Sequence, residues 1–246
     1  MKPPRQERHA GRSLHTFLVM RMNPKYPCLV LDHDDTVVAS EIAVNYPCFL
    51  EALEKFRPGE WMDHPEFVRW CFQYEFADFL RIRYSFTPEE GREEYLMWKE
   101  YARTHIPPAC TGIREIILEQ KRRGGLVCVA SLSSREMIER DYDLHIGVRP
   151  DLIFSADDPV CKPDPYPLEQ IMETYHLSPA ELLVVDDLKT GLQMAKAAHV
   201  PIAAAFWCRQ DAPEIIEYMT ERCDFAFHTT ADLYRFLFGE EMTHAD

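Results

Sequence analysis

The sequence lacks the closely spaced cysteines and histidines that hold a structural metal. Its eight cysteines include no C-x-x-C pair, and its ten histidines include no H-x-x-x-H pair. Several of the cysteines stand in apolar runs, where a thiol behaves as a small hydrophobic side chain. We therefore expect reduced core cysteines in a cytoplasmic protein.

Long apolar runs and an excess of basic residues are lacking as well. No run approaches the roughly 18 residues that a membrane helix needs, and Phe17–Met20 is too short for the core of a signal peptide. With 27 Lys and Arg against 41 Asp and Glu, the formal net charge is −14. Such a charge repels nucleic acid and anionic membranes, so neither is an expected partner.

Most of the chain alternates between short apolar runs and helical patterns. This alternation covers residues 22–40 and 104–246, and it predicts an α/β fold with a doubly wound parallel sheet. Cys28–Leu31 has the character of a buried parallel strand, because an apolar run ends abruptly in acidic residues. The other predicted strands are LVCVAS, DLIFSAD, LLVVDD, VPIAAAFW and CDFAFH.

Two regions depart from this alternation. Residues 1–21 are basic and show no apolar periodicity, so we expect a disordered leader, or a mis-assigned start with Met22 as the first residue. Residues 41–103 are helical in pattern and rich in aromatic side chains, which predicts a helical insert. Within it, the stretch 67–84 places apolar residues at three- and four-residue spacing, and Thr87-Pro is a typical helix start. The apolar face of that stretch carries Phe67, Trp70, Cys71, Tyr74, Ala77 and Ile82.

Acidic residues end two of the predicted strands. Asp32, Asp34 and Asp35 follow the first apolar run, and Asp186 and Asp187 end LLVVDD. In open α/β sheets, ligands bind outside the carboxyl ends of the strands. Like charges so close together need a neutralising partner, and a hard cation such as Mg²⁺ binds carboxylate oxygens. Taken alone, a solvated acidic turn remains an alternative for the first group, and a pair of helix N-cap carboxylates remains one for the second.

Hydroxyl and amino groups follow two further strands. Ser131 ends LVCVAS, and Ser133 stands at the start of a predicted helix, where hydroxyls and free N–H groups form an anion site. Lys162 lies between proline-stiffened turns in VCKPDPYP, where it could stabilise a phosphoryl group or a carboxylate. Taken alone, a plain N-cap and a surface lysine remain alternatives.

Together these segments resemble the haloacid dehalogenase (HAD)-like hydrolase superfamily, in its phosphatase and phosphomutase branch. The order is D-x-D-x-T, then strand–Ser, then K-P-x-P, then strand–D-D-x-x-x-G, and each motif stands at a strand end. The match covers roughly residues 26–206 apart from the insert. The resemblance implies a Rossmann-like core formed by residues 22–40 and 104–246. It also implies that residues 41–103 form a helical cap of the C1 type.

The resemblance assigns roles residue by residue. Asp32 matches the nucleophile that forms an aspartyl-phosphate, and Asp34 matches the general acid and base. Lys162 matches the lysine that steadies the nucleophile and the phosphoryl group. The positions matched to phosphate binding and to its loop are Thr36, Ser131, Leu132 and Ser133. The positions matched to Mg²⁺ are Asp32, Asp34 through its backbone carbonyl, Asp187 and, directly or through water, Asp186.

Two positions in the first motif differ from the common pattern of these relatives. Asp35 stands where many carry glycine, which adds negative charge beside the metal and leaves the turn geometry open. His33 stands where an apolar residue is frequent, and no role is assigned to its imidazole. The carboxylate of Asp34 favours phosphate esters, since dehalogenase and phosphonate-cleaving relatives lack it.

The function that the resemblance implies is Mg²⁺-dependent hydrolysis of a small phosphorylated metabolite, a phosphate monoester. A phosphosugar mutase of the β-phosphoglucomutase type is the main alternative, and a non-catalytic protein that binds phosphometabolites is a second. Arg81 and Arg83 of the insert are candidates for substrate specificity, unless they are simply solvated surface arginines. We expect a monomer or a weak dimer.

Overall fold

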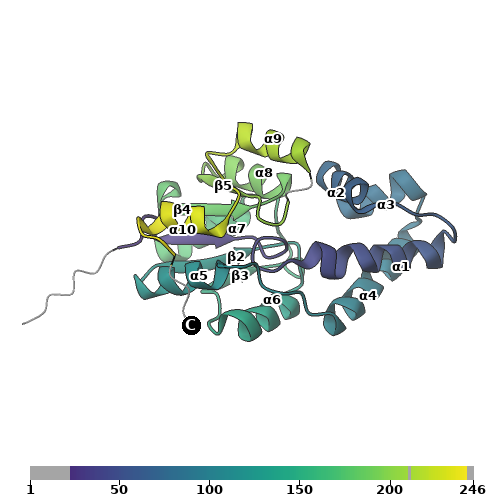
Figure 1. The fold of residues 1–246 in the computed structure, drawn as a ribbon, viewed down its shortest axis with the longest axis horizontal. Helices are drawn as coiled ribbons and strands as arrows, with labels where there is room; N and C mark the ends of the chain where they lie inside the picture. Colours follow the sequence, from purple (N-terminus) through teal and green to yellow (C-terminus); the bar gives the residue numbers. More distant parts are fainter. Residues whose placement is uncertain (1–22, 210–211, 243–246) are drawn as a thin grey trace, which may run out of the picture.

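The computed structural model describes residues 23–209 and 212–242 of the chain. The predicted leader, residues 1–21, lies outside the described residues. Within the described part, no helix is long and apolar enough to cross a membrane. Figure 1 shows two bodies of structure, an α/β core and a group of helices that extends from one end of it.

Six strands of the described chain form one parallel sheet in the order β3-β2-β1-β4-β5-β6. All six predicted strands are therefore confirmed, and so is the predicted fold class. The bounds are β1 Cys28–Leu31, β2 Leu126–Ala130, β3 Leu152–Phe154, β4 Leu182–Asp186, β5 Ile202–Ala205 and β6 Phe225–Phe227.

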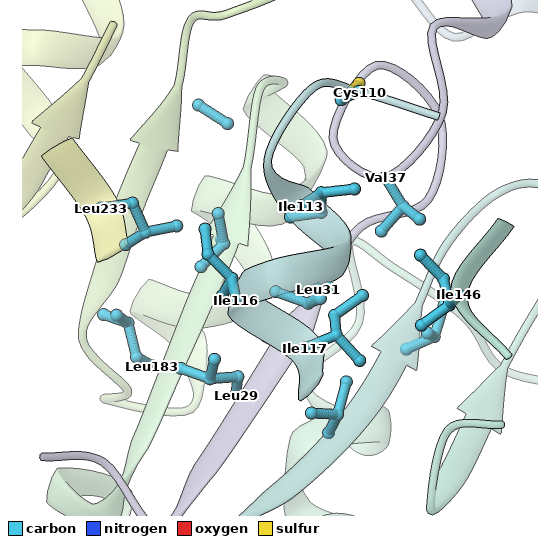
Figure 2. Close-up of a cluster of buried hydrophobic side chains, with 14 of the residues drawn as sticks. Leu29, Leu31, Val37, Cys110, Ile113, Ile116, Ile117, Ile146, Leu183 and Leu233 are labelled. Carbon is cyan, nitrogen blue, oxygen red and sulfur yellow. The ribbon is translucent and has the colours of Figure 1, made fainter. Parts of the chain in front are cut away.

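Helices cover both faces of the sheet, as a doubly wound fold requires. On one face, α5 lays Ile113, Ile116 and Ile117 over Leu29 and Leu31 of β1, as Figure 2 shows. The core helices are α5 (Ile113–Arg122), α6 (Arg135–Asp141), α7 (Tyr166–Tyr175), α8 (Lys189–Ala197), α9 (Pro213–Arg222) and α10 (Thr230–Phe238). The short elements η2 (Tyr142–Ile146) and η3 (Pro179–Glu181) complete the core.

The opposite face has its own apolar cluster. Leu168 and Ile171 of α7 are fully buried there, together with Met194 of α8 and Met219 of α9. Because the strands have apolar residues on both sides, β1 and β4 are buried along their whole lengths. The buried faces hold the strands in fixed register, which fixes where their carboxyl ends lie.

The helical insert between β1 and α5 consists of η1 (Glu41–Asn45), α1 (Tyr46–Phe56), α2 (His64–Gln73), α3 (Phe76–Tyr84) and α4 (Pro88–Thr104). It has a small aromatic core of its own around Phe49, Phe67 and Phe79. The predicted start of α4 is confirmed, since the hydroxyl of Thr87 accepts the N–H of Glu90 in a full capping box.

The prediction of one apolar face along residues 67–84 is wrong. The stretch forms two helices, because the backbone is extended at Tyr74 and Glu75. The change of direction leaves Ile82 45% exposed, whereas Phe79 is buried in the insert. No glycine or proline marks the break between the two helices. The three- and four-residue spacing of apolar residues continues across the break by chance, so the sequence pattern did not reveal it.

The carboxyl ends of the central strands meet at one edge of the sheet. Leu31 of β1 lies beside Val129 of β2 and Val185 of β4. The N–H of Asp32, one residue further on, donates to the carbonyl of Val185 over 2.9 Å. The residues that follow β1, β2 and β4 are therefore neighbours, although the chain separates them by about 100 residues and about 50 residues.

Candidate active site

Lys162 forms buried ion pairs with an aspartate of the first motif and with an aspartate of the fourth. Its ammonium nitrogen lies 2.7 Å from Oδ1 of Asp32 and 2.8 Å from Oδ2 of Asp186. All three side chains are buried. Burial alone would lower the pKa of Lys162, but the two carboxylates outweigh it and raise that pKa. Lys162 is thus a permanent positive charge against two of the predicted site residues.

Asp32, Asp186 and Asp187 form a buried carboxylate group. Each offers an oxygen within 4.8 Å of the others. Burial raises the pKa of both Asp186 and Asp187, because a charged carboxylate loses solvation there. Asp186 is already engaged through both oxygens, since Oδ1 accepts the N–H of Leu188 and Oδ2 accepts Lys162.

The carboxylate group fits a hard divalent cation. Within the described part of the chain, Oδ1 of Asp187 is buried and has no hydrogen-bond partner. A buried carboxylate oxygen without a partner is unfavourable, and coordination to a cation such as Mg²⁺ would satisfy it. The residues present therefore match the predicted metal, with Asp32 and Asp187 as the side chains best placed to hold it.

Asp34 occupies a different position from the carboxylate group. Its Oδ1 accepts the hydroxyl of Ser40 over 2.6 Å, and burial raises the pKa of Asp34. Together with Asn45 and Trp98 of the insert, it lines a small cavity between core and insert. A carboxyl group with a raised pKa at such a junction is suited to carrying a proton.

The hydroxyl residues lie where the strand pattern predicted. Ser131 and Ser133 are buried beyond the end of β2, and the N–H of Ser133 donates to the hydroxyl of Ser131 over 3.1 Å. Leu132 between them is 43% exposed. The hydroxyl of Thr36 is buried and lacks a hydrogen-bond partner among the described residues, while its carbonyl accepts the indole N–H of Trp207.

Asp35 adopts the backbone conformation that glycine would favour at its position, with φ +52°. Aspartate is one of the few other residues that tolerate this left-handed region. Its side chain is tied down on both oxygens, since Oδ1 accepts the N–H of Glu41 and Oδ2 lies 3.1 Å from Arg209. The turn is therefore compatible with Asp35, and the added negative charge has a cationic partner.

Arg209 is a buried residue of the site that the sequence motifs did not reveal. It is 4% exposed, and it donates to Oδ2 of Asp187 over 2.6 Å. It also pairs with Asp35 and with Glu41, the first residue of η1. Glu41 in turn lies 2.7 Å from Nε2 of His64 on α2. The one available signal was position, because Arg209 follows shortly after a predicted strand.

His33 is part of the core rather than of the carboxylate group. Its Nε2 lies 3.1 Å from Oδ2 of Asp141, and both side chains are only 1% exposed. Arg140 bonds to the other oxygen of Asp141 and to the carbonyl of Ala102 near the end of α4. The imidazole thus takes part in a buried network that connects the first motif with the insert.

Arg81 and Arg83 lie on α3 of the insert and are exposed. Arg81 pairs with Asp78 one turn away on the same helix, at 2.7 Å. The guanidinium of Arg83 lies 4.9 Å from the ring centroid of Tyr84. Neither contact involves the carboxylate group, so the predicted role of these arginines in specificity stays a prediction.

The fold and the site define an α/β enzyme whose acidic centre lies at the carboxyl edge of its parallel sheet. A family model for haloacid dehalogenase-like hydrolases matches residues 26–199. The chain belongs to this family of hydrolases, which confirms the family resemblance carried by the four motifs. No curated protein matches the sequence significantly.

Solved structures show the same fold at low sequence identity. A Lactobacillus plantarum protein with the provisional name phosphoglycolate phosphatase has a TM-score of 0.74 and 19% identity, over 87% of this chain and all of that one. A HAD-superfamily hydrolase of subfamily IA from Geobacter sulfurreducens has a TM-score of 0.62 and 20% identity, over 88% and 99%. A mutant of CbbY from Rhodobacter sphaeroides, in complex with xylulose-1,5-bisphosphate, has a TM-score of 0.66 and 17% identity, over 85% of this chain and 96% of that one.

Proposed function

We propose that the protein is a Mg²⁺-dependent phosphatase that hydrolyses small phosphate monoesters through an aspartyl-phosphate on Asp32. The observation that carries this proposal is the position of Asp32. Its carboxylate belongs to the buried carboxylate group and also contacts Lys162. An anionic carboxylate can attack an anionic phosphoryl group only if nearby positive charge offsets their repulsion. Phosphoryl transfer therefore depends mainly on positioning and on charge neutralisation.

In the first half-reaction, a carboxylate oxygen of Asp32 attacks the phosphorus of the ester. The bond between phosphorus and the ester oxygen breaks, and protonated Asp34 gives its proton to the departing alcohol. Asp32 then carries the phosphoryl group as a mixed anhydride. The raised pKa of Asp34 supports this role, because the acid must hold its proton until the leaving group needs it.

In the second half-reaction, Asp34 acts as the base. It takes a proton from a water molecule, whose oxygen attacks the phosphorus. The bond between Asp32 and phosphorus breaks, inorganic phosphate leaves, and both carboxyl groups return to their initial states. Lys162 keeps its charge throughout, and its contacts with Asp32 and Asp186 hold the nucleophile in place.

The phosphoryl oxygens would be bound at the carboxyl ends of β1 and β2. We assign this role to the hydroxyls of Ser131, Ser133 and Thr36 and to the backbone N–H of Leu132. Bound Mg²⁺ would neutralise charge on the phosphoryl group. It would be held by the side chains of Asp32 and Asp187 and the backbone carbonyl of Asp34, with Asp186 directly or through water.

The helical insert would act as the cap over this site. Asn45 and Trp98 bring the insert within reach of Asp34, since all three line the same cavity. An insert in that position can exclude water from the leaving-group side and contact the rest of the substrate. We therefore propose that the insert, including Arg81 and Arg83, selects the substrate, whereas the core performs the chemistry.

A phosphorylated metabolite is the proposed substrate class. The similarity to a CbbY mutant solved in complex with xylulose-1,5-bisphosphate, and to a protein provisionally named phosphoglycolate phosphatase, supports small phosphorylated carbon compounds as substrates. A cytoplasmic location and a monomer or weak dimer remain predictions from the sequence. The reduced state expected of the cysteines likewise stays a prediction.

A phosphate-release screen over phosphorylated metabolites tests the proposal. We expect Mg²⁺ to be required, so that chelation abolishes phosphate release and added Mg²⁺ restores it. Sugar 1-phosphates are assayed in parallel for isomerisation, because a mutase would return a rearranged sugar phosphate in place of inorganic phosphate. If the Mg²⁺-bound protein forms neither inorganic phosphate nor a rearranged sugar phosphate from any substrate, the phosphatase and mutase proposals both fail. The protein would then be a non-catalytic phosphometabolite-binding protein.

A further inference from the structure

We propose that Arg209 is a positioning residue, which holds the carboxylate of Asp187 in the orientation that binds the metal. This inference rests on the proposed function only in that Asp187 is taken as a metal ligand. Arg209 touches neither substrate nor reacting atoms in the proposed reaction. It acts through Asp187, and it belongs to no motif of the resemblance.

Arg209 contacts three carboxylates from three separate segments. Its Nε donates to Asp187 after β4 over 2.6 Å, one terminal nitrogen lies 3.1 Å from Asp35 after β1, and the other contacts Glu41 at the start of the insert. All three guanidinium nitrogens therefore have a carboxylate partner. The planar fork of arginine fixes these directions, which a lysine ammonium on a flexible stem cannot do.

The contact between Arg209 and Asp187 gives the two oxygens of Asp187 different environments. Arg209 occupies Oδ2, while Oδ1 is the buried atom that has no hydrogen-bond partner among the described residues. A rotation of the carboxylate would break a short charge-assisted bond, so Oδ1 is held facing away from the guanidinium. An oriented and otherwise unsatisfied oxygen is what a cation site requires from its ligand.

Neutralisation of Asp35 alone does not explain this arrangement. The bond to Asp187 is shorter than the bond to Asp35, at 2.6 Å against 3.1 Å, and it uses a different nitrogen. Asp35 also has a second partner, since its Oδ1 accepts the N–H of Glu41. Asp35 and Glu41 contact the two terminal nitrogens, and we infer that they hold the guanidinium in place while Nε contacts Asp187.

The test compares Arg209→Gln and Arg209→Lys with a matched control, Arg123→Gln. Arg123 is likewise buried and paired with two glutamates, Glu119 at 2.6 Å and Glu240 at 2.8 Å, but it lies outside the site. Mg²⁺ affinity of each full-length protein is measured by titration calorimetry without substrate. The melting temperature is measured in parallel, as a readout of the structural effect alone.

We expect both Arg209 variants to bind Mg²⁺ about 10- to 100-fold more weakly, which is the usual effect of losing a partner that orients a metal ligand. Arg123→Gln should lower the melting temperature and leave Mg²⁺ affinity within about twofold. If Arg209→Gln does not fold, Arg209→Lys decides, because it retains the charge. Parent-like affinity in Arg209→Lys, or unchanged or tighter affinity in Arg209→Gln, would overturn the proposal.

The two proposals fail in different ways. If the parent binds Mg²⁺ but releases no phosphate from any ester, the proposed phosphatase function fails, and the Mg²⁺ affinities of the variants still decide the role of Arg209. If an ester is hydrolysed, kcat and KM of Arg209→Lys give an independent check. Misplaced Asp187 should lower kcat at saturating Mg²⁺, whereas a purely structural role should leave it unchanged once the protein is folded.

Discussion

The carboxylate of Asp186 lies directly against the backbone of Gly191, in the first turn of α8. A Cβ atom added to Gly191 would stand 2.0 Å from Oδ2 of Asp186. That oxygen is the one that accepts Lys162, and its partner Oδ1 accepts the N–H of Leu188. The glycine of the fourth motif is thus required by a close approach, and not by an unusual backbone angle.

Gly191→Ala should displace Asp186 and disturb its bonds to Lys162 and Leu188. We expect an overpacking cost of about 1–3 kcal/mol in the free energy of unfolding, and a loss of activity of at least about tenfold. Urea denaturation and steady-state assays measure the two effects. Gly91→Ala is the matched control, because Gly91 also lies in the first turns of a helix and has nothing within 4 Å. It should stabilise the protein by about 0.4–1 kcal/mol.

Lys162→Met should destabilise the fold strongly, because it leaves the buried carboxylates of Asp32 and Asp186 without their cation. Removing one partner of a buried ion pair costs about 3–5 kcal/mol. Lys55→Met removes an exposed pair with Glu93, whose side chains are about half exposed, and should cost at most about 1 kcal/mol. Equal losses of unfolding free energy for Lys162→Met and Lys55→Met in urea denaturation would argue against buried ion pairs between Lys162, Asp32 and Asp186.

Glu94 of α4 makes the stability of the helical insert depend on pH. The residue is 5% exposed, and burial raises its pKa to about 7. Its pKa in the unfolded chain is about 4.3, so folding favours the protonated form. The contribution of protonated Glu94 to the free energy of unfolding is fully present below about pH 4, and it is lost as the pH rises through about 7.

Glu94→Gln should remove this dependence. At about 1.4 kcal/mol for each pH unit between the two pKa values, the parent loses about 3–4 kcal/mol of its free energy of unfolding relative to the variant between pH 4 and pH 8. Chemical denaturation of both proteins across that range measures the difference. Parallel curves for parent and variant would show that Glu94 titrates normally in the folded protein.

Substrate choice by the insert is tested with Arg81→Ala and Arg83→Ala. If these side chains contact substrate, the ranking of natural phosphate esters should change by more than about tenfold, while activity on a small artificial ester stays near the parent value. Arg92→Ala is the control, because Arg92 pairs with Glu89 on α4 just as Arg81 pairs with Asp78 on α3. Equal falls on all substrates would count against a role in specificity.

The parallel sheet and the location of the site could be predicted from the sequence. Carboxyl ends of parallel strands meet at one edge, so Asp32, Ser131 and Asp186 were expected at the same edge once the strands were recognised. That they are close neighbours follows from the strand order, which places β1 between β2 and β4. Their detailed contacts could not be predicted. Whether Lys162 reaches Asp32 depends on the path of a loop, and apolar periodicity carries no information about such a path.

Arg209 and α9 show two different limits of the sequence. Arg209 contacts Glu41 across 168 residues of chain, and a single arginine in a loop has no periodic signal that predicts its partners. We predicted no helix between the last two strands, VPIAAAFW and CDFAFH, although Pro213 at the start of α9 is a favourable first-turn residue. The helix-start signal at Pro213 was therefore present in the sequence, and it was overlooked in the stretch between two predicted strands.

The central claim, covalent catalysis by Asp32, predicts distinct effects for the first two aspartates. Asp32→Asn removes the nucleophile while keeping its shape, and activity should be almost abolished. Asp34→Asn should still bind Mg²⁺, because the metal contact there is a backbone carbonyl. It loses proton transfer, which should lower the rate by about 10²–10⁴. An activated phosphodonor, whose leaving group needs little protonation, should still phosphorylate that variant.

The most direct measurement is therefore to quench each protein during reaction with an activated phosphodonor and to locate the phosphoryl group by peptide mass. We predict a label on Asp32 in the parent and in Asp34→Asn, and no label in Asp32→Asn. A label on any other residue, or ordinary activity in Asp32→Asn, would contradict the proposed mechanism.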